Sequence, residues 1–272
     1  MANIIEIKSI NLPELEVYYN LNEKQLFRLN EPEAGLFIAE SPMVVERALE
    51  KGCMPVSFLL DKKILNDKVK EMLAHFDVPA YAGDDEVLCS ITGFHLTRGM
   101  LCAMQRPPEE DIDKILAEAS RIAVLENVMN PTNMGALFRS AAALGMDAVL
   151  VTEGGCDPLY RRCVRVSMGT VFQLPWAYLP KDRNTADFLR QMGFKTAAMA
   201  LRKNSVSLED EKLNSEGKLA VVLGSEGPGL NESTIDSCDY TVMIPMAHGV
   251  DSLNVAAAAA VAFYRLGMKD KR

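Results

Sequence analysis

Hydrophobic residues in this chain are grouped in short runs that alternate with longer amphipathic segments. The run Gly35–Glu40 precedes an amphipathic segment over 42–51, and a second run follows over 56–60. Short apolar runs predict β-strands, and the periodicity between them predicts a helix. The same rhythm predicts a helix over 65–75, a strand over 78–81, a helix over 84–91 and a strand over 99–104. These elements form a small α/β domain.

A second α/β region begins with an apolar run over 122–125, a polar loop and a helix from Asn133 or Met134 to Leu144. Further strands are predicted over 147–151, 195–200, 219–223 and 241–244. Strands separated by helices indicate a parallel sheet with helices on both faces. Ligands of such sheets bind beyond the carboxyl ends of the strands, so we expect the site in the loops that follow them.

The boundary between the two regions is placed at Gln105–Asp111. Its paired prolines and acidic residues suit neither a strand nor a helix. We therefore expect two domains, spanning 1–106 and 119–272, joined by a linker over 107–118. A chain of 272 residues has room for two domains of ordinary size.

The composition indicates a soluble folded protein, with 49% hydrophobic and 24% charged residues. No apolar stretch approaches the ~20 residues that cross a bilayer, and residues 1–10 lack a basic flank before an apolar run. We expect a cytoplasmic protein with no membrane partner. The six cysteines contain no C-x-x-C pair and the three histidines are far apart, which predicts free thiols in a reducing compartment and no metal site.

The net charge of −8 argues against a nonspecific polyanion binder, although a local basic patch can still bind RNA. Arg161, Arg162 and Arg165 form one candidate patch for RNA. Arg202 and Lys203 form another. An ordinary solvated surface is the alternative interpretation of both.

The first loop that bears on chemistry covers 126–135 and runs into a helix containing Arg139. Asn133 is a plausible N-cap of this helix. The neighbours of Arg139 along the helix are almost all small or apolar, so we expect its charge to meet an anion or a polar pocket. A structural ion pair is the alternative. Gly135 lies one turn earlier on the same face and leaves room for a ligand.

The second loop, Gly224–Leu230, follows a predicted strand and contains three glycines and a proline. Such a loop makes a tight turn that brings backbone amides close to a ligand. It matches neither the P-loop nor the G-x-G-x-x-G pattern, so the nucleoside triphosphate and dinucleotide interpretations lose support. Glu226 is either a hydrogen-bonding residue of this loop or a surface carboxylate.

The third loop covers 244–254 and enters a helix over 255–263 whose side chains are mostly small. Asp251 or Ser252 is predicted to cap this helix. Small side chains on every face permit close packing against another backbone, within the subunit or across a dimer interface. His248, which precedes a glycine, is predicted to be a turn residue and not a catalytic base.

The motifs of the three loops occur in a specific order: Asn133-x-Gly135-x-x-x-Arg139, Gly224-x-Glu226-Gly-x-Gly229, Ile244-Pro-Met246 and Ser252-Leu-Asn254. This series resembles the SpoU (TrmH-like) family of RNA ribose 2′-O-methyltransferases, in the knotted SPOUT class. The segment 165–169 also resembles a family segment. The resemblance covers about 120–268, and the N-terminal part resembles the family's L30e-like substrate-binding domain.

The resemblance implies a C-terminal segment threaded through a loop as a deep trefoil knot, which general folding rules would not suggest. It implies that S-adenosylmethionine is held in a bent form, with the backbone at Gly224, Ile244 and Leu253 against its adenosine part. The cofactor-binding positions that it implies are Leu223, Gly224, Gly229, Ile244, Met246, Ser252 and Leu253. The polar active-site positions are Arg139, Asn133, Glu226, Ser252 and Asn254. Family members are homodimers with composite sites, so Asn133 is a candidate for the neighbouring subunit's pocket.

The expected chemistry aligns a ribose oxygen with the electrophilic methyl of the sulfonium and removes the oxygen's proton. Free arginine has a pKa of about 12.5 or above, so we expect Arg139 to bind RNA phosphate and stabilise the developing alkoxide instead of acting as the base. The 2′-hydroxyl distinguishes RNA from DNA. Ribosomal RNA is favoured over transfer RNA. The alternatives are a noncatalytic RNA-binding protein with this fold and a generic nucleotide-binding α/β enzyme.

Overall fold

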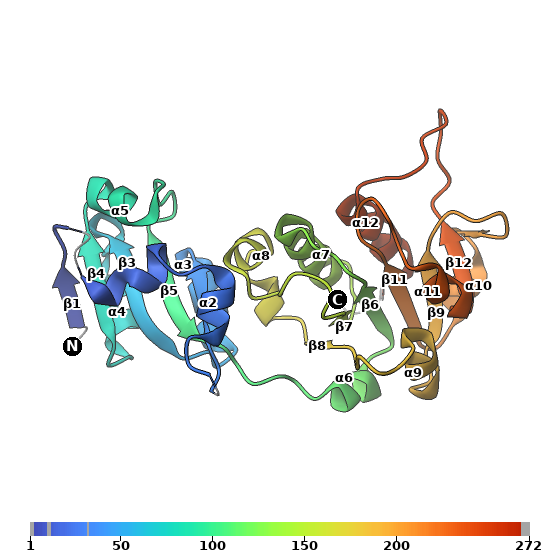
Figure 1. Cartoon of the computed structure of the whole chain (residues 1–272), viewed down its shortest axis with the longest axis horizontal. Helices are drawn as coiled ribbons and strands as arrows, with labels where there is room; N and C mark the ends of the chain where they lie inside the picture. The colour runs from blue at the N-terminus through green and yellow to red at the C-terminus, as the bar shows by residue number, and fades with distance from the viewer. Residues whose placement is uncertain (1–2, 10–11, 32, 268–272) are drawn as a thin grey trace. The chain divides into compact units, whose positions relative to one another are not determined.

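The computed structural model describes residues 3–9, 12–31 and 33–267, which form two compact units (Figure 1). Unit 1 comprises the chain up to residue 108 together with 159–172, and unit 2 comprises 109–158 and the chain from 173 onward. Two expectations are corrected here. Residues 159–172 were assigned to the C-terminal domain but belong to unit 1. The predicted linker is wrong over 112–118, because Ile112–Glu118 forms helix α6 and its Leu116 is fully buried.

Unit 1 is built on a five-stranded mixed sheet with the strand order β1-β4-β3-β5-β2. Its strands are β1 (Asn3–Glu6), β2 (Leu36–Glu40), β3 (Pro55–Asp61), β4 (Pro79–Gly83) and β5 (Met100–Gln105). Its helices are η1 (Pro13–Leu15), α1 (Glu16–Tyr19), α2 (Glu23–Arg28), α3 (Pro42–Glu50), η2 (Lys62–Ile64), α4 (Asp67–Ala74), α5 (Asp85–Thr92), α8 (Arg161–Val166) and η3 (Thr170–Phe172). Strands β1, β3 and β4 are parallel, whereas β5 is antiparallel to β2 and β3. The predicted alternation of strands and helices over 35–104 is confirmed.

Local sequence explains where the helices of unit 1 begin and end. The Ser41 side chain accepts a hydrogen bond from the Val44 amide at 3.4 Å, and Pro42 occupies the first turn of α3. Asn66 caps α4 in the same way through the Val69 amide at 3.0 Å. Helix α5 ends at Gly93, whose φ of +76° is in the left-handed region that favours glycine.

Unit 2 is built on a seven-stranded sheet with the order β10-β12-β9-β11-β6-β7-β8, and every strand pairing in it is parallel. The strands are β6 (Arg121–Leu125), β7 (Ala148–Val151), β8 (Trp176–Tyr178), β9 (Lys195–Met199), β10 (Val206–Ser207), β11 (Leu219–Leu223) and β12 (Tyr240–Met243). The helices are α6, α7 (Pro131–Ala143), α9 (Thr185–Gln191), α10 (Glu211–Ser215), α11 (Glu232–Ser237) and α12 (Val255–Leu266). The predicted parallel sheet is confirmed.

Helices cover both faces of this sheet (Figure 1). Residues of α6, α9 and α11 share one core cluster with Val124, Leu150 and Val222 of the central strands. Helices α7 and α12 pack against each other, with α7 also on β7 and α12 on β11. Every residue of β6, β7 and β11 is buried, which matches their continuous apolar runs. Within the described ranges, no helix has both the length and the apolar composition to cross a bilayer.

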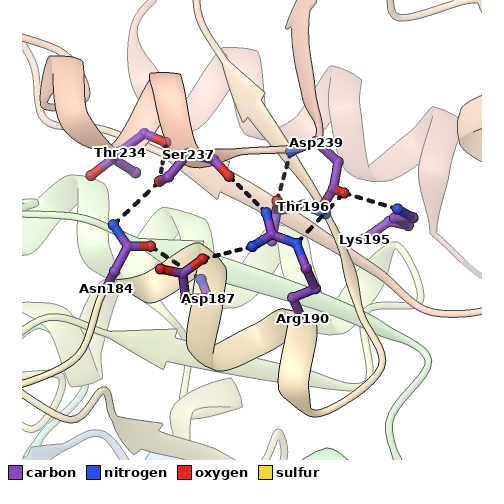
Figure 2. A network of polar contacts seen from close by, with 8 residues as sticks. All are labelled: Asn184, Asp187, Arg190, Lys195, Thr196, Thr234, Ser237 and Asp239. Atoms are coloured by element: carbon purple, nitrogen blue, oxygen red, sulfur yellow. Dashed lines mark hydrogen bonds and ion pairs between the residues drawn. The ribbon is translucent and has the colours of Figure 1, made fainter.

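A polar network at the amino end of β12 fixes this strand beside β9 (Figure 2). Asp239 Oδ2 accepts hydrogen bonds from the Thr196 backbone N–H at 3.0 Å and from Thr196 Oγ1 at 2.9 Å. Its Oδ1 accepts from Lys195 Nζ at 2.9 Å. Arg190 donates to Asp187 Oδ1 at 2.6 Å and to the Ser237 carbonyl at 2.9 Å. The network therefore joins the amino ends of β12 and β9, at the edge of the sheet opposite to the carboxyl ends of these strands.

We expect Asp239→Asn to lower the free energy of unfolding by about 2 kcal/mol at neutral pH. Burial alone would raise the pKa of Asp239, but the bonds from Lys195 and Thr196 outweigh it and hold the pKa below its usual value. The stabilisation is thus complete above the unfolded pKa of about 4 and is lost as the pH falls through the folded pKa. Urea unfolding should show the difference between Asp239→Asn and wild type shrinking below about pH 4.

Asp187→Asn is the control within the same network, because that carboxylate is 62% exposed. An exposed pair of this kind contributes at most about 1 kcal/mol. Equal losses in the two variants would contradict a special role for Asp239.

Candidate functional site

A cavity of about 400 Å³ lies at the carboxyl ends of β9, β11 and β12. Its volume is within the range of small-molecule sites. Every residue predicted to bind the cofactor lines it: Leu223, Gly224, Gly229, Ile244, Met246, Ser252 and Leu253. The second and third loops therefore meet around one cavity, at the edge of the sheet where a ligand was expected.

The glycine loop doubles back closely on itself. An ideal Cβ placed on Gly224 would lie 2.3 Å from both the carbonyl carbon of Gly229 and the nitrogen of Leu230. The Gly229 amide donates to the Ser225 carbonyl at 3.1 Å, and Gly227 and Gly229 have φ values of +90° and +73°. Glycine is therefore required at 224 for space, and the turn places backbone against the cavity.

Three of the predicted polar residues form one cluster at this site. The Asn254 Nδ2 atom donates to Glu226 Oε1 at 3.0 Å and lies 3.4 Å from Asn133 Oδ1. The Asn254 oxygen accepts from the Ala256 amide at 3.0 Å and so caps α12. Because the cap fixes the amide oxygen, the amide nitrogen is directed toward Glu226 and Asn133. Ser252 also lines the cavity.

Both predicted N-caps are wrong. Helix α12 is capped by Asn254 and not by Asp251 or Ser252. Helix α7 is capped by Asn130, whose Oδ1 accepts from the Thr132 amide at 2.8 Å, and not by Asn133. Asn133 lies within the first turn instead, which leaves its side chain available to Asn254.

Arg139 lies outside this cluster. No described residue of the same chain provides an anion or a polar pocket for its charge, so that expectation stays a prediction. The residue is exposed, and it makes no hydrogen bond or ion pair within the described part of the chain. It does not line the cavity. Six residues along an α-helix correspond to a rotation of about 240°, so Asn133 and Arg139 project from different sides of α7.

The basic cluster of α8 belongs to unit 1. The Arg161 Nε and Nη2 atoms each lie 3.1 Å from Glu40 Oε2, and Arg165 Nη1 lies 3.4 Å from Glu40 Oε1. Burial lowers the pKa of the Arg161 guanidinium, and Glu40 opposes this shift. Arg162 is exposed. Arg161 and Arg165 are half-buried, so Arg162 is the most exposed of the three arginines.

The loop after β9 was missed as part of the site. Met199, Ala200 and Leu201 line the cavity, and Leu201 is 64% exposed. The strand predicted over 195–200 ends at the edge of the sheet where a ligand was expected. Its position could therefore have indicated that the loop after it belongs to the site. In the same loop, Arg202 forms an ion pair with Glu232, and Lys203 is exposed.

His248 is exposed and has a φ of +57°, which confirms it as a turn residue. The six cysteines are all free. Across the described ranges, no group of three or more His, Cys, Asp or Glu side chains is arranged to hold a metal ion. The candidate chemistry therefore rests on the cavity and its polar cluster.

Comparison with known proteins identifies the family. Residues 120–264 match the SpoU rRNA Methylase family. An uncharacterized tRNA/rRNA methyltransferase of Mycobacterium bovis is 40% identical over 85% of this chain and 80% of its own length. The 23S rRNA (guanosine(2553)-2′-O)-methyltransferase RlmP of Bacillus subtilis is 27% identical over 86% of this chain and 89% of its own. An AdoMet-bound rRNA methyltransferase from Sinorhizobium meliloti shares the fold, with a TM-score of 0.80 and 23% identity over 97% of both chains.

The chain therefore belongs to the SpoU family of RNA methyltransferases, as the order of its motifs predicted. Enzymes of this family use S-adenosylmethionine, so the predicted cofactor is that of the family.

Gly224→Ala tests the glycine loop. We expect it to weaken S-adenosylmethionine binding at least tenfold, because the new Cβ would overlap the Gly229 and Leu230 backbone and force the loop open. Gly217→Ala is the matched control, since a Cβ there meets nothing within 4 Å. Calorimetric titration of both variants measures the effect, and equal affinities would contradict the expectation.

Proposed function

We propose that this protein transfers the methyl group of S-adenosylmethionine to a ribose 2′-hydroxyl of structured RNA. The observation that carries the proposal is the charge of the cavity. Its described lining residues include two carboxylates, Glu226 and Asp251, and no lysine or arginine. A sulfonium cation suits such a lining, whereas the phosphates of a nucleotide do not. This disfavours a generic nucleotide-binding enzyme.

The site residues are assigned by position. The backbone at Gly224, Ile244 and Leu253 would hold the adenosine part of the cofactor, with Leu223, Gly229, Met246 and Ser252 completing the lining. The bound cofactor supplies an electrophilic methyl group. Asn133, Glu226 and Asn254 form a polar cluster, fixed by the capping of α12, that would orient the ribose next to it.

Arg139 would bind the RNA phosphate and stabilise the developing alkoxide. Because it projects from the other side of α7, we assign it to the cavity of a second copy of the chain, in a homodimer. Two observations support a dimer. Met129, just before α7, is 66% exposed, and Val261 on α12 is 42% exposed. Apolar side chains at such positions are covered when a second subunit binds.

Two further assignments concern the fold. A trefoil knot is supported by the position of β12, which lies between β9 and β10 while β11 lies on the other side of β9. After β12 the chain returns as α12 to α7. The α/β organisation of unit 1 supports an L30e-like RNA-binding role, with Arg162 as the most accessible of the α8 arginines.

Ribosomal RNA is the favoured substrate, since RlmP, with which this chain aligns over most of its length, acts on 23S rRNA. Ribosomal RNA as the substrate also agrees with the predicted cytoplasmic location. Transfer RNA is the alternative substrate.

Two measurements test the proposal. Calorimetry should show tighter binding of S-adenosylmethionine than of ATP or NAD. Maps of 2′-O-methylation in total RNA, from cells with and without the protein, should differ at a defined nucleotide. Tighter ATP or NAD binding would favour a nucleotide enzyme. Cofactor binding with identical maps would favour a noncatalytic RNA-binding protein.

A further inference from the structure

Glu126 holds both ends of the glycine loop. It follows β6 directly and is 5% exposed. Its backbone N–H donates to the Leu223 carbonyl at 2.8 Å, immediately before the loop. Its Oε1 accepts from the Asn231 backbone N–H at 2.8 Å, immediately after the loop, and its Oε2 accepts from Thr234 Oγ1 at 2.6 Å. A single residue thus closes the segment Gly224–Leu230.

The carboxylate is buried without a bonded cation. In the part of the chain that the structure describes, no lysine or arginine forms an ion pair with Glu126. Its charge is balanced by the two hydrogen bonds and by the amino end of α11, where Asn231 provides no side-chain cap. Burying a carboxylate is costly unless such bonds are formed. The position of Asn231 is therefore strongly tied to that of β6.

Glu126 does not line the cavity, but the loop that it closes does. Gly224 and Gly229 provide backbone to the cavity wall, and Glu226 bonds to Asn254. These hydrogen bonds of Glu126 are called the Glu126 clamp. Loss of the clamp would free Gly224, Gly229 and Glu226 together. We infer that Glu126 is a positioning residue that keeps the loop shaped for S-adenosylmethionine in the ligand-free protein. The inference rests on the proposed function, because it assigns the loop to that cofactor.

The structure offers a matched control. Asp239 also accepts hydrogen bonds from a backbone N–H and a threonine hydroxyl. Both donors belong to Thr196, and the bonds lie at the amino ends of β9 and β12 (Figure 2). Asp239→Ala therefore removes a carboxylate of similar local role far from the cavity along the strands. A loss of stability alone should appear in both variants, whereas a loss of loop shape should appear only in Glu126→Ala.

The test compares these full-length variants by calorimetry with S-adenosylmethionine and by hydrogen exchange without it. We expect Glu126→Ala to raise the Kd at least tenfold and to speed exchange of the amides in 225–231. Glu126→Gln should stay within about threefold of wild type, because an amide can accept from Asn231 and donate to Thr234. Asp239→Ala should lower the Tm and leave the Kd unchanged.

If Glu126→Ala does not fold, Thr234→Val removes one of the two bonds, and a Kd rise of about threefold with faster loop exchange is expected. Unchanged Kd and loop exchange in the folded variants, even with a lowered Tm, would overturn the inference. Failure of the wild type to bind S-adenosylmethionine would instead overturn the proposed function, and the exchange data would still report on the clamp.

Discussion

We expect Arg139→Ala to lower kcat for RNA methylation by a factor of about 10³, the scale seen when a charge-stabilising group is removed. The Kd for S-adenosylmethionine should stay unchanged, because the group proposed to meet Arg139 is the RNA phosphate and not the cofactor. Single-turnover assays with radiolabelled cofactor measure the first quantity and calorimetry the second. Lys212→Ala, an exposed cation on α10, is the control and should retain full activity. Unchanged turnover of Arg139→Ala would remove this residue from the mechanism.

An experiment that mixes two inactivated variants tests whether Arg139 acts in the cavity of its own chain or in that of a partner subunit. In the proposed composite site, Arg139→Ala and Gly224→Ala would damage different halves. If Arg139 serves the partner's cavity, half of the randomly mixed dimers contain one intact site, and activity returns to about a quarter of wild type. If Arg139 served its own chain's cavity, the mixture would show no more activity than the average of the two variants assayed separately at the same low cofactor concentration.

Arg121→Met should lower the free energy of unfolding by about 4 kcal/mol. Arg121 is 6% exposed, and among the residues that the structure describes its guanidinium donates only to backbone carbonyls. Those carbonyls belong to Ser120, Asn214, Glu216, Gly217 and Leu266, at 2.7 to 3.2 Å. Burial lowers the pKa of this guanidinium, while Asp147 and Glu216 oppose the shift. Methionine would fill the space but leave these carbonyls without their donors.

Urea unfolding measures this loss. Arg265→Met is the control. Arg265 and Arg121 line one surface cavity, and Arg265 donates a hydrogen bond at 3.4 Å to the Glu209 carbonyl. Arg265→Met should lower the free energy of unfolding by less than about 1 kcal/mol. Equal losses in the two variants would show that the Arg121 bonds contribute little.

The main strands could be predicted from the sequence because their apolar runs are continuous. Strands β8 and β10 have three and two residues, too short to give a pattern. The membership of 159–172 in unit 1 depends on pairing between Glu40 and Arg161, which are 121 positions apart. A contact at that separation leaves no local signal.

The candidate site was predicted better than its detailed geometry. Glycine spacing located the cavity, because a close turn requires glycine at Gly224 whatever the surroundings. The caps were misassigned because several neighbouring polar residues have similar capping ability, so local preference alone did not select Asn130 or Asn254. The direction of Arg139 could have been derived from helical periodicity relative to Asn133. The clamp by Glu126 depends on tertiary hydrogen bonds and had no signal in the sequence.

Neither unit is a continuous stretch of polypeptide, because 159–172 belongs to unit 1 but interrupts unit 2. Dissecting the protein at residue 108 would therefore separate Glu40 from Arg161 and Arg165 and leave a buried carboxylate uncompensated. The remaining fragment would carry α8 without its acidic partner. A faithful excision of unit 1 needs the α8 segment grafted on through a designed connection, and an inactive fragment made by simple truncation would say little about RNA recognition.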